Sequence, residues 1–93
     1  MEDKEIQNRI VEKMLRKRVT GGKKKQVDTV VNHSLPSHAQ GRGKTLIEEM
    51  KADSDAPIEA YGGGHRDNIR LTSVKDAVEF LKENDGNVPF GFD

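Results

Sequence analysis

The sequence lacks cysteine and tryptophan, and its aromatic residues are one tyrosine and three phenylalanines. Without cysteine the chain forms neither disulfides nor thiolate metal sites, and a reducing compartment is the default expectation. No apolar run approaches the roughly 20 residues of a membrane-spanning helix, and Met1-Glu2-Asp3 does not begin a signal peptide. With 93 residues, of which 32% are hydrophobic, one modest core is expected. We therefore expect a single small cytoplasmic domain without a membrane partner.

The formal net charge is zero, but the charge is unevenly distributed along the chain. Residues 1–51 hold twelve Lys and Arg against seven Asp and Glu, whereas residues 52–93 hold four against nine. Six cations lie between Arg16 and Lys25 with no acid among them. Such a local patch suffices to bind a polyanion through counterion release. A solvated basic loop is the ordinary alternative, and the sequence favours neither.

The first half of the chain predicts three helices. Glu2 to Arg18 carries a broad apolar stripe at helical spacing, and Gly21-Gly22 is expected to end that helix. Lys23 to Asn32 is harder to assign because its three valines are β-branched, but their spacing favours a short helix over a strand. A third helix is expected over Leu35 to Met50, with Pro36 in its first turn.

The third helix has two different faces. One is apolar, and it consists of Ala39, Gly43, Leu46, Ile47 and Met50. The other is small, polar or basic, and it consists of Ser37, Gln40, Gly41, Lys44 and Thr45. The second face either enters a nucleic-acid groove or is a plain solvated surface, and taken alone it is more often the latter.

The second half of the chain predicts a hairpin and a last helix. Ile58–Tyr61 and Asn68–Thr72 alternate in polarity around a glycine-rich link, which is typical of two paired strands. Ser73 is expected to cap the final helix, with Asp76 as a variant of the capping box and Asn84-Asp85-Gly86 at its end. The tail 87–93 carries Val88, Phe90 and Phe92, which either fold back onto the core or meet a second subunit.

This order of elements resembles the winged-helix family, the winged variant of the helix-turn-helix, and small archaeal members in particular. The resemblance covers roughly residues 5–84. The residues that carry it are Leu35-Pro36-Ser37-His38, Gly41, Lys44, Leu46-Ile47-Glu48-Glu49-Met50, Tyr61-Gly62 and Ile69-Arg70-Leu71-Thr72. It implies an α+β, mostly helical fold over residues 1–86, with three N-terminal helices, a two-stranded β-hairpin wing and a C-terminal helix. It also implies double-stranded DNA as the partner, in a transcriptional regulator or a chromatin-associated factor.

By position, the resemblance assigns roles to particular side chains. Gln40 would pair with adenine, Lys44 would reach guanine or phosphate, and Gly41 would let the backbone come close. The remaining contacts would be made by Ser37, His38, Arg42, Thr45, by Lys23, Lys24 and Lys25 on phosphates, and by His65 and Arg66 from the wing. The family also includes RNA-binding and protein-interaction modules. An interaction module that uses the aromatic tail is therefore the alternative function, and a homodimer through the first helix and the tail is a further prediction.

Enzyme chemistry finds little support in the sequence. Gly43-Lys44-Thr45 matches the end of a P-loop, but His38 stands where the first glycine is required and no strand precedes it. The three histidines have no cysteines or carboxylate cluster beside them for a metal site. We therefore expect neither an enzyme nor a cofactor.

Overall fold

A computed structural model of the chain describes residues 1–62 and 67–92. Over these residues the fold is α+β, with four helices and a three-stranded antiparallel sheet. In chain order the elements are α1 (Asp3–Arg16), β1 (Lys25–Gln26), α2 (Val27–Ser34), α3 (Ser37–Ala52), β2 (Ile58–Ala60), β3 (Asn68–Leu71) and α4 (Val74–Glu83). Over the same ranges, no helix combines the length and the apolar character that crossing a bilayer requires.

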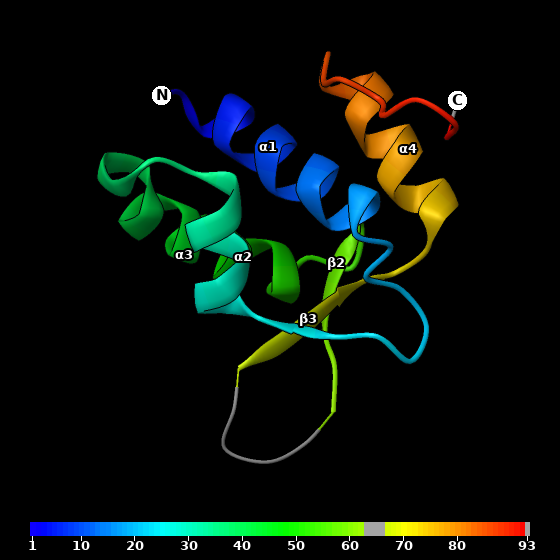
Figure 1. Cartoon of the computed structure of the whole chain (residues 1–93), viewed down its shortest axis with the longest axis horizontal. Helices are drawn as coiled ribbons and strands as arrows, with labels where there is room; N and C mark the ends of the chain where they lie inside the picture. Colours follow the sequence, from blue (N-terminus) through cyan, green and yellow to red (C-terminus); the bar gives the residue numbers. More distant parts are fainter. Residues whose placement is uncertain (63–66, 93) are drawn as a thin grey trace.

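Helix α1 occupies the middle of the molecule, and each of the other three helices packs against it (Figure 1). Helices α2 and α3 lie on one side of α1 and α4 lies on the other, while the sheet closes the end near the C-terminus of α1. The predicted stripe of α1 is buried as expected, since Ile10, Val11 and Leu15 have no measurable exposure. Ile47 of α3 and Leu81 of α4 meet the same core and are equally buried.

The sheet differs from the predicted hairpin by one strand. Strand β3 pairs with β2, as expected, but also with β1 on its other edge, where Lys25 lies opposite Ile69. The prediction of a helix from Lys23 was therefore wrong at its start, because α2 begins at Val27. Two residues are too few to produce an alternating pattern, and the pairing depends on a partner more than 40 positions away.

Helices α1 and α4 are each followed by a residue in the left-handed conformation. Arg18, with a φ of 53°, adopts the left-handed conformation that ends α1, and the Val19 amide donates to the Met14 carbonyl at 3.0 Å. This is a Schellman cap, so the prediction that Gly21-Gly22 stops the helix was wrong. At the end of α4 the left-handed residue is likewise Asp85 and not Gly86. A Cβ on Gly86 would instead press on Asn8, so that glycine is required for close approach.

The cap at the start of α4 follows the sequence prediction. The Ser73 hydroxyl accepts a hydrogen bond from the Asp76 amide at 2.9 Å. Replacing Ser73 with alanine removes the acceptor for this amide, and we expect the free energy of unfolding to fall by about 1 kcal/mol. Chemical denaturation measures the change, and Ser73→Asp, which retains an acceptor, should leave the stability nearly unaltered.

The C-terminal tail folds back over most of its described length. Val88 and Phe92 pack against the core, and the Arg18 guanidinium lies 4.7 Å from the centre of the Phe92 ring. Phe90, in contrast, is fully exposed. The tail therefore packs Val88 and Phe92 against the core and leaves Phe90 in solvent.

Candidate nucleic-acid interface

The outward face of α3 is formed by small and polar side chains in its first half. Pro36 precedes the first turn, and the apolar face of the helix turns inward, so that Ser37, His38, Gly41, Lys44 and Thr45 are exposed. Gln40 is half-buried, and its amide donates to the Leu35 carbonyl at 3.2 Å. The structure thus brings five of the predicted contact residues onto one surface and engages Gln40 in local structure.

The two glycines of α3 have different surroundings. Gly41 faces open space, since a Cβ there would meet nothing within 4 Å. Gly43 is buried, and a Cβ there would overlap the side chain of Leu35 and press on Val31. Gly43 therefore lets α3 approach the end of α2, and the sequence correctly placed it on the apolar face.

Arg42 lies apart from the other predicted contacts, against the start of α1. Its guanidinium donates twice to the Asp3 carboxylate, at 2.9 and 2.6 Å. This hydrogen-bonded ion pair lowers the pKa of Asp3 and raises the pKa of Arg42. Arg42 is thus tied to α1, and it does not share the outward face of Lys44.

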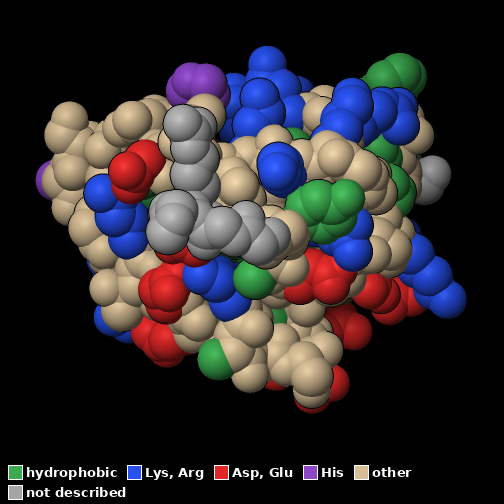
Figure 2. Space-filling model, turned by 90° about the horizontal axis from the view of Figure 1, so that it is seen from below, with side chains coloured by type: hydrophobic (Ala, Val, Ile, Leu, Met, Phe, Trp, Pro, Cys, Tyr) green, Lys and Arg blue, Asp and Glu red, His purple; other side chains and the backbone are tan. Residues whose placement is uncertain are grey.

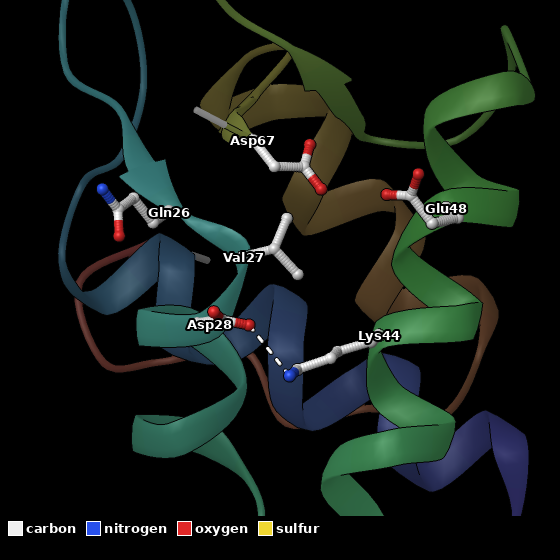
Figure 3. Close-up of a pocket in the computed structure, with 6 residues that line it drawn as sticks. All are labelled: Gln26, Val27, Asp28, Lys44, Glu48 and Asp67. Carbon is white, nitrogen blue, oxygen red and sulfur yellow. Dashed lines mark ion pairs between the residues drawn. The ribbon is translucent and has the colours of Figure 1, made fainter. Parts of the chain in front are cut away.

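Between α2, α3 and the sheet lies a cleft of about 280 Å³, shown in Figure 3. It is lined by Gln26, Val27, Asp28, Lys44, Glu48 and Asp67. The Lys44 ammonium crosses the cleft to the Asp28 carboxylate at 2.9 Å, so its charge is already paired. Three acids against one lysine make the lining of this cleft anionic.

A second lysine reinforces the pairing at the C-terminal end of α3. The Lys51 ammonium lies 2.7 Å from Asp67 and 2.9 Å from Glu48. The hydrogen bond that Lys51 donates to Asp67, followed by the one that it donates to Glu48, raises the pKa of Lys51. The half of α3 that adjoins β2 and β3 is consequently neutral or acidic rather than basic.

A group of exposed lysines lies on the α1–β1 connection and at the start of β1. Lys23, Lys24 and Lys25, with Lys17 and Val19, line a shallow hollow of about 270 Å³. Within residues 1–62 and 67–92, no carboxylate forms an ion pair with any of these lysines. In Figure 2 several Lys and Arg side chains gather along the upper edge, whereas most of the visible Asp and Glu side chains lie in the lower half with other Lys and Arg side chains among them.

The connection that carries these lysines is anchored to β3. The Leu71 amide donates to the Val19 carbonyl at 2.7 Å, and the Arg70 guanidinium donates to the Gly21 carbonyl at 2.6 Å. Arg70 also stacks on Tyr61, 4.1 Å from the ring centre, and donates to Glu59. Two residues of β3 thus fix the position of the lysine-bearing loop.

The predicted wing contacts His65 and Arg66 lie outside the described residues. The acids Asp28, Glu48 and Asp67 were missed as a group because they come from three distant segments, and no local pattern joins them. A row of cations along α1 could have been predicted from the sequence, because Arg9, Lys13 and Lys17 recur every four residues on one helical face.

Comparison of the chain with models of known families, with curated protein sequences and with solved structures gave no match. Across residues 1–62 and 67–92, no three His, Asp or Glu side chains cluster closely enough to hold a metal ion. The assignment of a function therefore depends on the surfaces described above.

Proposed function

We propose that the chain is a duplex-DNA-binding protein of the winged-helix type, acting as a transcriptional regulator or a chromatin-associated factor. Its element order has the helix–strand–helix–helix–hairpin succession of that architecture, and the third helix has a polar exposed half. The single observation that carries the proposal is the group of lysines at 23–25, which pair with no carboxylate of the described residues and are anchored to the sheet that contains β2 and β3. A loop held in this way presents positive charge to a phosphate backbone without ordering cost.

In this proposal the first half of α3 faces the major groove. His38 and Thr45 offer hydrogen-bonding groups, and the absence of a side chain at Gly41 allows a close approach of the helix backbone. Lys44 reaches the DNA only by leaving Asp28, an exchange of one anion for another. Lys23, Lys24 and Lys25 hold phosphates and so position the helix without reading sequence.

A protein-binding role is the second candidate, because Phe90 is a fully exposed aromatic side chain beside a tail that otherwise folds back. In that case Phe90 is an anchor for a partner or a second copy of the chain. Phe90→Ser would then abolish association of the protein with that partner or second copy, measured by sedimentation, and would leave the affinity for DNA unchanged.

The test of the DNA proposal is the salt dependence of binding to a short duplex. With about four phosphates neutralised, affinity should fall roughly a hundredfold between 50 and 200 mM salt. His38→Ala with Thr45→Ala removes the proposed groove contacts from exposed positions, and we expect affinity for a selected target duplex to drop about tenfold or more. Fluorescence anisotropy measures both effects.

The same titration also tells the candidates apart. Wild-type protein that does not bind any duplex at 50 mM salt would contradict the DNA proposal. Equal binding by wild type and the double variant on the selected target would place α3 outside the interface.

A further inference from the structure

A basic groove runs between α1 and α2 on the side away from α3. It consists of three adjoining hollows that share lining residues, the first at the α2 C-terminus and the last at the lysine-bearing loop. The first has a volume of about 410 Å³ and shares Lys13 and His33 with the second, which is only a shallow link of about 20 Å³. The second is joined to the third through Lys17 and Lys25. We call the whole surface the α1–α2 groove.

The α1–α2 groove is almost uniformly cationic. Its charged lining residues are Arg9, Lys13, Arg16, Lys17, Lys23, Lys24 and Lys25, with His33 beside them and Glu12 as the one acid that lines it. Glu12 is already neutralised by Arg16 of the next helical turn, at 2.9 Å. Within the described part of the chain, no carboxylate pairs with the remaining cations of the groove. This charge balance is opposite to that of the cleft at α3.

The shape and chemistry of the groove indicate which part of a nucleic acid it fits. From Arg9 to Lys17 the α1 wall extends about 12 Å at 1.5 Å per residue, a length over which duplex DNA presents about seven phosphates. Apart from charged side chains and His33 the described lining residues are Met14, Val19, Thr29, Val30 and Ser34, with no Phe, Tyr or Trp ring among them on which bases would stack. The groove is therefore suited to a paired backbone rather than to unstacked single strands.

We propose that the α1–α2 groove binds the phosphate backbone of duplex DNA without regard to sequence, and so extends the phosphate contacts of Lys23, Lys24 and Lys25 along α1, away from the exposed face of α3. Among residues 1–62 and 67–92, none of α3, β2 or β3 lines the groove. Helix α2 separates the two surfaces, with Asp28 lining the cleft at α3 and Thr29 and His33 lining the groove. The inference rests on the proposed DNA binding, but it assigns part of that binding to a surface other than the exposed face of α3.

Two matched double variants test the groove. Lys13→Gln with Lys17→Gln removes two unpaired groove cations and keeps good helix formers, whereas Lys75→Gln with Lys82→Gln removes the same charge from exposed positions of α4. Binding is measured by anisotropy from 50 to 200 mM salt on two 20-base-pair duplexes of unrelated sequence. For the groove variant, the slope of log affinity against log salt should be shallower by about 1.8, equally on both duplexes. The α4 variant should retain the wild-type slope.

The outcomes separate this inference from the proposed function. Suppose that the groove variant keeps the wild-type slope while the α3 variant (His38→Ala, Thr45→Ala) loses affinity for its target. That result overturns the inference about the groove and leaves the proposed function standing. A shallower slope in the groove variant with an unaffected α3 variant supports the groove and overturns the role of α3. If the wild type does not bind duplex DNA at 50 mM salt, both are overturned. A shallower slope on one duplex only contradicts sequence-independent contact.

Discussion

Replacing Gly43 with valine should lower the free energy of unfolding by about 2–3 kcal/mol, a shift of the melting temperature by roughly 10–20 °C. Gly43 is buried in α3, and a Cβ there already overlaps Leu35 and lies close to Val31 and Ile10. Two further methyl groups have no room unless α3 moves away from α2 and α1. Circular dichroism during thermal and chemical unfolding measures the loss.

Gly41 is the matched control, two positions away on the same helix. A Cβ there meets no atom within 4 Å, so Gly41→Ala should raise the free energy of unfolding by about 0.5–1 kcal/mol through reduced backbone entropy of the unfolded chain. Opposite signs at the two positions are the expected result. A stabilising Gly43→Val would contradict the packing described for α2 and α3.

Neutralising the three acids of the cleft should raise the affinity for duplex DNA about tenfold at low salt. Asp28, Glu48 and Asp67 line the cleft beside the exposed half of α3 and pair with Lys44 and Lys51. Each charge acting on a phosphate about 7 Å away in water is worth ~0.6 kcal/mol, or about 2 kcal/mol for three before screening by salt. The change is Asp28→Asn, Glu48→Gln and Asp67→Asn in one protein, which keeps the hydrogen-bond acceptors of Lys51.

The control for this gain of affinity removes three exposed acids elsewhere, with Glu5→Gln, Glu79→Gln and Glu83→Gln. Both triple variants have the same net charge, so a general charge effect raises their affinities equally. A local effect raises only the affinity of the cleft variant, and the difference should vanish at high salt. Equal affinities of the two variants at 50 mM salt would show that α3 does not approach the DNA.

Local periodicity was sufficient to predict the helices and their buried faces. The stripe of α1 and the apolar face of α3, from Ala39 to Met50, are buried as the 3.6-residue spacing predicts. The alternation in Ile58–Ala60 and Asn68–Leu71 likewise located β2 and β3. These signals are local because each element buries a face that its own sequence defines.

The features that were missed depend on distant partners. Strand β1 forms because Lys25 and Gln26 pair with Ile69 and Asn68 of β3. The sequence Lys25–Gln26 by itself contains no pattern that predicts this pairing. The helix ends were placed at glycines, whereas Arg18 and Asp85 adopt the left-handed conformation, because the caps are completed by main-chain hydrogen bonds that tolerate a strained residue.

The exposure of the polar residues of α3 was predicted from the sequence, but the ion pairs around them were not. The lysines at 23–25 and the polar residues of α3 were identified, but the pairing of Lys44 with Asp28 and of Arg42 with Asp3 was not. Ion pairs between helices depend on how the helices cross, which sequence spacing does not specify. The winged-helix assignment and the roles of the site residues remain proposals for the titrations above.

The opposed charges on the two sides of α2 have a consequence for association kinetics. A molecule with zero net charge has no long-range attraction as a monopole, but separated patches give it a dipole that turns the basic side toward a polyanion during approach. Encounter should therefore be faster in low salt and already oriented, with the rate of association falling steeply as salt is added. The acidic cleft would be repelled by the phosphates, so that the basic side of the protein contacts the DNA first, before any base is contacted.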